Sequence, residues 1–238
     1  MCQKINNTMS DKEQLLSPLQ VSPQPTLKIT KSERTRAAIL NSALNFIWSH
    51  PFRDMTVKSL MASTGVGRAT FYQYFKDRHE VMESLLNIVR GEIFDISEHW
   101  TTGVGDPVAL LSETFTGLVR LFHQRGPIVR AVADAAPSDR RLEKAWLQFL
   151  GEFDDAACAR IEADQKQGLI LEFDARPVAI ALTRLNASML IQAFGQHPRS
   201  QPEPIREVLF RIWVSTLYGA KWIGSGSSDL VRTGIDMG

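Results

Sequence analysis

The sequence predicts an all-α protein of about nine helices, with a three-helix N-terminal head on a larger helical body. Apolar residues recur at three- and four-residue spacing through most of the chain, as they do on one face of a helix. Between these segments, Asp, Thr, Pro and Gly mark where helices begin and end. No stretch alternates apolar and polar residues for long enough to suggest a sheet.

The N-terminal region is expected to be a disordered tail followed by the first helix. Residues 1–30 are polar, contain three prolines and show no periodicity. From 32–49 the apolar positions between Ala37 and Trp48 repeat at helical spacing. His50-Pro51 should end this helix, because the residue before a proline avoids the helical region.

Residues 56–75, TVKSLMASTGVGRATFYQYF, contain two short helical segments separated by a glycine turn. Thr56 can cap the first segment, in which Leu60 belongs to the apolar face. Gly65 provides the backbone freedom that a left-handed helix end needs. A second helix is expected to begin near Gly67 and to continue through the aromatic residues. Two helices joined in this way form a helix-turn-helix, whose second helix can enter the major groove of DNA.

The remaining helices are predicted from the residues that commonly begin and end helices. A long helix should begin at Asp77-x-x-Glu80, which resembles a capping box, and reach about Trp100. Five more are expected at 107–123, 127–135, 137–167, 174–194 and 202–223. The expected domains are a tail over 1–30, a DNA-binding head over 31–80, a body over 81–223 and a flexible tail over 224–238.

Composition is that of a globular protein, with 44% hydrophobic and 22% charged residues. No apolar run approaches the ~20 residues that span a bilayer, and charges such as Lys4 and Asp11 interrupt any signal-peptide core. Cys2 and Cys158 have neither disulfide nor metal spacing. We therefore expect a cytoplasmic protein without cofactor, metal ion or membrane partner.

The charge is divided between the head and the rest of the chain. Residues 28–80 hold nine basic and four acidic side chains, whereas residues 81–238 hold 16 basic and 20 acidic ones. A basic head on an acidic body is the electrostatic footprint of a DNA-binding module. A chance excess of solvated charges is the alternative explanation.

The helix-turn-helix resembles that of the TetR family of transcriptional regulators. The resemblance rests on Thr56, Leu60, Gly65-Val66, TFYQYF at 70–75 and KDRHEVM at 76–82. It covers roughly residues 33–82 without a gap. It implies a homodimeric repressor of a double-stranded DNA operator, with activation in place of repression left open.

Helix geometry assigns roles to residues of this motif. Arg68 and Thr70, at the start of the recognition helix, are the candidates for base edges, since arginine commonly pairs with guanine. Tyr72 and Tyr74 suit sugar-phosphate or a thymine methyl, and Gln73 suits a base or the backbone. The predicted DNA-contacting residues are Arg34, Thr56, Val57, Lys58, Gly67, Arg68, Thr70, Tyr72, Gln73, Tyr74, Lys76 and Arg78.

Four of these residues, Arg34, Thr56, Lys58 and Arg78, have further physical reasons for this prediction. Thr56 and Lys58 lie at a helix N-terminus, where free N–H groups and the helix dipole attract phosphate, and Arg78 occupies a similar place. A flexible basic arm carrying Lys28, Lys31 and Arg34 could also reach phosphate or the minor groove. In contrast, Phe71 and Phe75 are expected in the core, against Leu44 and Val57.

The last two helices are the candidates for a dimer interface. Ile205, Val208, Leu209, Ile212, Trp213, Thr216 and Leu217 form an apolar stripe on one of them. The preceding helix contributes Ala181, Leu182, Leu185, Ser188, Met189 and Gln192. Two such helices per subunit would form a four-helix interface, as the family resemblance implies. Intramolecular core packing is the alternative.

The body also carries aromatic residues that could line a pocket for a lipophilic molecule, with Asn186 as its polar group. Ordinary core packing would give the same pattern. The body is similar to the EthR-type members of the family, mycobacterial repressors that control activation of the drug ethionamide. That similarity implies a hydrophobic tunnel, although Leu111, Ala157 and Thr183 depart from the EthR pattern. The predicted ligand-binding residues are Leu111, Phe115, Leu118, Phe122, Trp146, Phe149, Leu150, Phe153, Asn186, Met189 and Trp213.

Two other functions were weighed against this one. An enzyme is disfavoured, because the five histidines are scattered and the sequence contains no phosphate loop, nucleophile elbow or His-Glu-x-x-His motif. A DNA-binding regulator without a small-molecule ligand, controlled by a protein partner or by its abundance, stays open.

Overall fold

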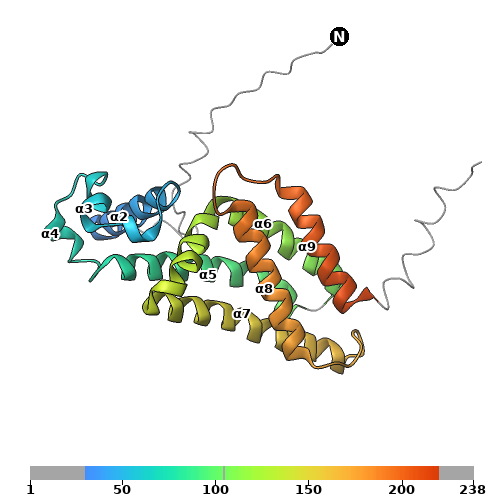
Figure 1. The fold of residues 1–238 in the computed structure, drawn as a ribbon. Coiled ribbons are helices and arrows are strands. Elements are labelled where there is room, and N and C mark those ends of the chain that lie inside the picture. The colour runs from blue at the N-terminus through green and yellow to red at the C-terminus, as the bar shows by residue number, and fades with distance from the viewer. Residues whose placement is uncertain (1–29, 104, 220–238) are drawn as a thin grey trace, which may run out of the picture.

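The computed structural model describes residues 30–103 and 105–219. These residues form eight α-helices and two 3-10 turns with no strand among them, which confirms the all-α fold (Figure 1). The elements are α2 (Lys31–Ile47), η1 (Phe52–Asp54), α3 (Val57–Ala62), α4 (Arg68–Phe71), α5 (Arg78–Thr102), α6 (Pro107–Ala135), η2 (Ala136–Ser138), α7 (Arg140–Lys166), α8 (Ala175–Phe194) and α9 (Pro202–Leu217).

Helices α2, α3 and α4 form the head at one end of α5 (Figure 1). Capping boxes start both α2 and α3: Thr30 pairs with Glu33, and Thr56 pairs with Ser59. Gly65 adopts φ +69°, as the turn between α3 and α4 requires. The tail predicted for residues 1–30 lies, apart from Thr30, outside the described residues.

The recognition helix is shorter than the sequence predicted. Its α-helical part covers only α4, from the N-cap Gly67 to the C-cap Tyr72. The chain then tightens, since the N–H groups of Gln73 and Tyr74 bond to carbonyls three residues back, at 3.2 and 2.9 Å. Lys31 and Arg34 belong to the first turn of α2 and not to a flexible arm.

Helix α5 runs from the head into the body, where it packs along α6 and α7 (Figure 1). Asp77 caps α5 as predicted, accepting the Glu80 N–H at 2.9 Å. Glu80 itself accepts the N–H of Lys76 at 2.6 Å, so the second half of a capping box does not form. Helices α8 and α9 complete the bundle against α6 and α7.

The predicted break between residues 123 and 127 is wrong, because α6 continues through Pro127. A proline inside a helix leaves the carbonyl four residues earlier without its N–H partner. Here that carbonyl belongs to His123, and it accepts a hydrogen bond of 2.7 Å from Arg199 Nη1. Gly126 lets α6 approach the end of α8, since a Cβ there would lie 2.5 Å from the Phe194 carbonyl oxygen.

The other helix boundaries lie close to those predicted. Helix α7 starts after its cap Asp139, slightly later than expected, because η2 occupies 136–138. It ends as predicted at Gly168 (φ +65°), in a Schellman motif that joins the Leu169 N–H to the Asp164 carbonyl at 2.8 Å. The predicted continuation of the last helix to residue 223 lies largely outside the described residues.

Helix α8 is the one described helix long and apolar enough to cross a bilayer by length and composition. Only a third of its apolar window is buried within this chain. Its exposed positions are Arg176, Pro177, Ala181, Ser188 and Gln192, so its outer side is of mixed polarity.

Candidate functional site

The recognition element, which is α4 and the tightened turn after it (68–75), exposes a row of polar and aromatic side chains. Tyr72 is 52% exposed, and Arg68 and Gln73 are exposed beside it. Arg68 Nη2 donates to the Tyr72 hydroxyl at 3.3 Å, and its guanidinium lies 5.9 Å from the Tyr72 ring. Thr70 and Tyr74 are half-buried. The structure therefore presents Arg68 to solvent already oriented by a neighbouring ring.

The buried side of the same element confirms the core prediction for Phe71 and Phe75, which are 0% and 3% exposed. Their rings lie 5.9 Å apart, and the Arg36 guanidinium lies 5.1 Å from the Phe75 ring. Val57 packs against this core, whereas Lys58, on the same turn, is exposed. Lys58 is therefore exposed to solvent at the start of α3, a helix end that Val57 anchors to the core.

Arg78 has a role that the sequence did not predict. Its Nη1 donates to the carbonyls of Phe52, Arg53 and Met55, at 3.4, 2.9 and 2.6 Å. The guanidinium also lies 4.6 Å from the Phe52 ring. Arg78 thus holds η1 against the start of α5, and a phosphate contact by its other nitrogens stays a prediction.

The body contains a narrow cavity of about 100 Å³ between α5, α6, α7, α8 and α9. Nine of the eleven predicted ligand-binding residues line it, while Trp146 and Met189 lie outside the lining. Its lining also includes Ile93, Ser97, Trp100 and Thr101 of α5, which the sequence analysis missed. Their spacing places all four on one helix face, a signal that was present in the sequence.

One end of the cavity is built on Asn186 and Trp213. The Trp213 indole Nε1 donates to Asn186 Oδ1 at 2.9 Å. Because an indole nitrogen is only a donor, this bond fixes the amide with its NH₂ group directed elsewhere. Trp100 and Phe115 meet the Trp213 ring edge-on, with centroids 5.5 and 5.8 Å away.

A buried carboxylate lies behind the cavity wall. Asp154 is 2% exposed and receives two 2.8 Å hydrogen bonds from Arg184. The Thr183 hydroxyl, whose residue lines the cavity, also donates to Asp154. Paired in this way, the carboxylate ties α7 to α8 without an uncompensated charge next to the apolar space.

The end of the body farthest from the head is closed by a second buried polar network. Asp164 receives hydrogen bonds from Arg160 at 3.0 Å and from the Tyr218 hydroxyl at 2.7 Å. Burial, and then the hydrogen bond to Asp164, raise the pKa of Tyr218, so the phenol stays protonated. Among the described residues, no three His, Cys, Asp or Glu side chains are placed to hold a metal ion.

Ion pairs join the head to the body where α5 begins. His79 Nε2 lies 2.6 Å from Asp139 Oδ2, at the start of α7. Arg141 bonds to Asp77 at 2.8 Å and to Glu83 at 2.6 Å. Hydrogen bonds with Glu83 are the largest cause of the raised pKa of Arg141, so its positive charge is permanent. The head is therefore held to the body by a compact charged joint.

Comparisons with known proteins match both parts of this architecture. Residues 39–85 match the family described as "Bacterial regulatory proteins, tetR family", and residues 111–219 match "Transcriptional regulator EthR, C-terminal domain". The HTH-type transcriptional regulator EthR of Mycobacterium tuberculosis is 27% identical over 197 residues, which cover 76% of this chain and 86% of EthR. EthR of Mycolicibacterium smegmatis is 23% identical over 192 residues, with 79% and 88% covered.

Solved structures show the same fold. A putative TetR-family regulator from Syntrophomonas wolfei has a TM-score of 0.68 at 18% identity, covering 78% of this chain and 96% of its own. A putative regulator from Pseudomonas aeruginosa has a TM-score of 0.65 at 18% identity, with 82% and 95% covered. With its head and body both matched, the chain belongs to the TetR family of transcriptional regulators and carries an EthR-type C-terminal domain.

Proposed function

We propose that the protein is a homodimeric repressor that binds a palindromic DNA operator and is released from it by a lipophilic small molecule. The observation that carries this proposal is the apolar cavity, because its α5 wall continues directly into the DNA-binding head. A ligand that changes the position of α5 would change the position of the head. Such a regulator works on chromosomal DNA, so we place it in the cytoplasm.

The recognition element supports the DNA-binding part of the proposal. Arg68 is exposed at the N-terminal end of α4, the end that enters the major groove in a helix-turn-helix. Lys58 is exposed at the start of α3, where phosphate binding needs a cation. Arg34, Gly67, Thr70, Gln73, Tyr74 and Lys76 complete the proposed contact surface.

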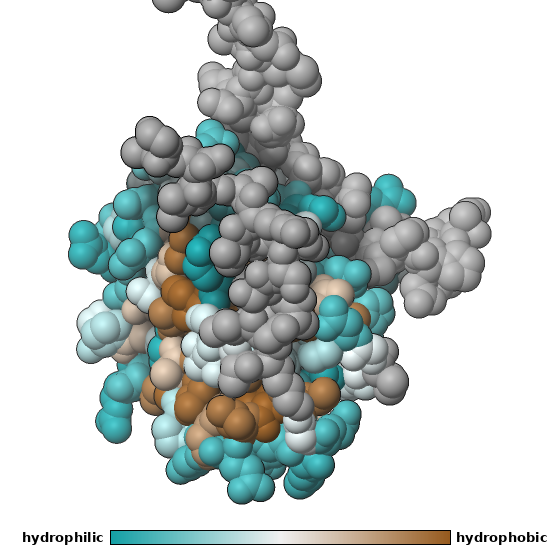
Figure 2. Space-filling model, turned by 90° about the vertical axis from the view of Figure 1, so that its right-hand side faces the viewer, coloured by the Kyte–Doolittle hydropathy of each residue, from teal (hydrophilic) through white to brown (hydrophobic). Residues whose placement is uncertain are grey.

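The outer face of α9 supports the dimer. Val208 is 43% exposed, and Ile205 and Ile212, on the same side of α9, are half-exposed. Leu209 and Trp213 face inward and are buried, so α9 is apolar on two sides. Figure 2 shows apolar side chains gathered in patches on the side of the molecule where α9 lies. A two-fold interface is self-complementary, which suits a pair of apolar helices.

The cavity itself indicates the class of ligand. Its lining is apolar except for the hydroxyl groups of Ser97, Thr101, Thr114 and Thr183 and the amide of Asn186. Drug-sized ligands occupy pockets of roughly 300–1,000 Å³, so a ligand must widen this cavity of about 100 Å³ as it enters. A slender molecule with a flexible alkyl part fits that requirement best.

An operator-release assay tests the proposal. The full chain is titrated onto a DNA duplex from upstream of its own gene, without and with methyl decanoate as the lipophilic probe. We expect methyl decanoate to raise the thermal midpoint and to weaken operator binding. Ala157→Trp, which fills the cavity, should remove both responses, whereas Leu147→Trp on the exposed side of α7 should keep them.

The small volume of the cavity favours a second candidate, a TetR-family regulator without a small-molecule ligand. This candidate predicts operator binding that no lipophilic compound weakens, with Ala157→Trp simply destabilised by overpacking. Operator binding that is insensitive to a panel of alkyl esters, alcohols and acids would decide for it.

A further inference from the structure

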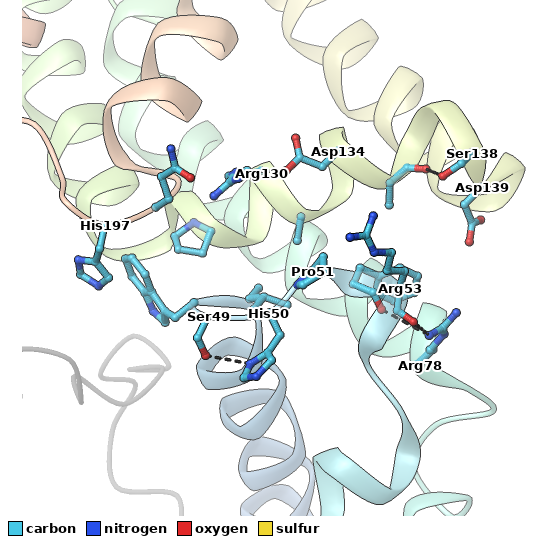
Figure 3. A pocket seen from close by; sticks show the side chains of 17 residues that line it. Ser49, His50, Pro51, Arg53, Arg78, Arg130, Asp134, Ser138, Asp139 and His197 are labelled. Atoms are coloured by element: carbon cyan, nitrogen blue, oxygen red, sulfur yellow. Dashed lines mark hydrogen bonds and ion pairs between the residues drawn. The ribbon is translucent and has the colours of Figure 1, made fainter.

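A second and much larger hollow, called the cleft below, lies between the head and the body, outside the apolar cavity. It has a volume of about 760 Å³. Its head wall is formed by the end of α2, the following loop and η1; its body wall is formed by the second half of α6, η2 and the loop between α8 and α9. Figure 3 shows α6, with Arg130 and Asp134, on one side of this hollow and the segment from Ser49 to Arg53 on the other.

Both walls carry guanidinium groups with unused hydrogen-bond donors. Arg53 is 86% exposed, and its one carboxylate neighbour among the described residues, Asp54, is 3.9 Å away, beyond hydrogen-bond distance. Arg130 uses only Nε, which bonds to Asp134 at 3.1 Å. Arg78 uses only Nη1, on the carbonyls of the head. Within the described part of the chain, the remaining N–H groups of these three arginines have no partner.

The acidic groups of the cleft, in contrast, already have partners. Asp139 accepts hydrogen bonds from His79 and from the N–H groups of Arg141 and Leu142. Asp134 accepts from Arg130 on the same helix. The cleft therefore has an excess of donors over acceptors, which suits an anion.

An apolar surface completes the cleft. The Trp48 ring stacks on His197 with centroids 4.7 Å apart, and the Arg199 guanidinium lies 5.3 Å from the same ring. Pro51 and Pro127 contribute apolar edges from the two opposite walls. These edges are the apolar part of a lining that is otherwise mostly polar.

From this arrangement we infer that the cleft is a second effector site, which takes a small organic anion with a carboxylate or phosphate group. Its walls belong to the head and the body, which are joined through α5 and through the ion pairs at Asp139, so an occupant that contacts both walls favours one separation of them. Occupancy must then change operator affinity, and operator DNA must change anion affinity by the same factor.

Calorimetric titration of the full chain with benzoate, phenyl phosphate and uncharged benzyl alcohol tests this site. We expect one or both anions to bind and the alcohol not to bind. Arg53→Gln and Arg130→Gln should each weaken anion binding by about tenfold, the effect of losing a charged hydrogen-bond partner. Arg120→Gln is the matched control, because Arg120 is exposed on α6 and does not line the cleft.

Further measurements separate this site from the body cavity. Ala157→Trp should leave anion binding unchanged, and adding operator duplex should shift the anion Kd. Carboxylate binding without phosphate binding, or the reverse, identifies which anion the site takes and supports it. The inference is overturned if neither anion binds at millimolar concentration, if benzyl alcohol binds equally well, or if binding survives both arginine substitutions or is lost in Ala157→Trp.

Discussion

Arg68 is the residue on which sequence-specific binding should depend most. Its guanidinium is exposed and rests against Tyr72, so little rotamer freedom is lost on binding a base. Arg68→Ala should cost about 1–3 kcal/mol of operator affinity and relax the preference at one base position. Lys58→Ala should instead weaken all duplexes alike and flatten the salt dependence. Binding titrations against operator and scrambled DNA check both variants. Unchanged specificity in Arg68→Ala would show that Arg68 does not contact a base.

Asn186 has a structural role that must be separated from any ligand contact. Its carbonyl accepts the Trp213 N–H, so Asn186→Leu leaves a buried donor unpaired, which costs about 1–3 kcal/mol of unfolding free energy. Trp213→Phe removes that donor. In the double variant the Asn186→Leu substitution should therefore cost less than it does alone. Urea unfolding of the four proteins measures this coupling, and strictly additive costs would contradict it.

The continuity of α6 depends on a side chain from another element. Arg199 donates a hydrogen bond to the His123 carbonyl, which has no backbone partner because Pro127 lacks an N–H group. Arg199→Ala should therefore cost about 1–3 kcal/mol of unfolding free energy. In a Pro127→Ala background the backbone N–H returns, and the same substitution should cost clearly less. Urea unfolding provides the test, and an equal Arg199→Ala cost in both backgrounds would show that the carbonyl is not the reason.

This interaction also shows which elements can be predicted from sequence. The caps Thr56 and Asp77, and the end of α7 before Gly168, depend on neighbours within a few residues, so they could be predicted from the sequence. The partner that lets α6 pass Pro127 comes from 76 residues away, and no local pattern marks it.

The candidate cavity was predictable only in part for the same reason. The aromatic residues of α6 and α7 recur at helical spacing, so the sequence predicted that these two helices line the cavity. The α5 wall depends on how α5 docks against α6 and α7, and so does the position of Trp146 and Met189 outside the lining.

At the scale of the whole molecule, the joint between head and body should weaken in acid. Burial opposes ionisation of Asp139, but hydrogen bonds from His79 and from backbone N–H groups outweigh it and hold its pKa below the ordinary 3.8. A depressed folded-state pKa stabilises the protein above about pH 4, and this stabilisation is lost as the pH falls through the folded value.

Asp139→Asn should therefore lower the thermal midpoint near neutral pH, and the midpoint should decrease less below pH ~4 than it does in the wild type. The reason is that the amide still caps α7 but cannot ionise. Asp134→Asn, on the exposed side of α6, should follow the wild-type curve. Thermal unfolding between acid and neutral pH measures both variants. A wild-type acid profile in Asp139→Asn would show that Asp139 contributes no pH-dependent stability.

The dimer can be tested with one charge on α9. Val208→Glu places a carboxylate on the exposed apolar face without disturbing the buried Leu209 and Trp213. We expect the variant to be monomeric in light scattering and to lose operator binding, because a two-fold operator needs two heads. Arg120→Glu, outside this face, should remain dimeric. A wild-type monomer at micromolar concentration would exclude the interface.

The length of α5 has a mechanical consequence. Its 25 residues make a rod of about 37 Å at 1.5 Å per residue, with the head at one end and the cavity wall near the other. A tilt of about 5° at the cavity end would therefore move the head by roughly 3 Å, and in the proposed dimer the separation of the two heads would change by about twice that. A hydrogen bond to a base tolerates only about 0.5 Å of this movement, because its donor–acceptor distance lies between about 2.7 and 3.2 Å. In the proposed dimer, a ligand that widens the cavity by about the width of an alkyl chain would tilt α5 and move both heads out of register with the operator.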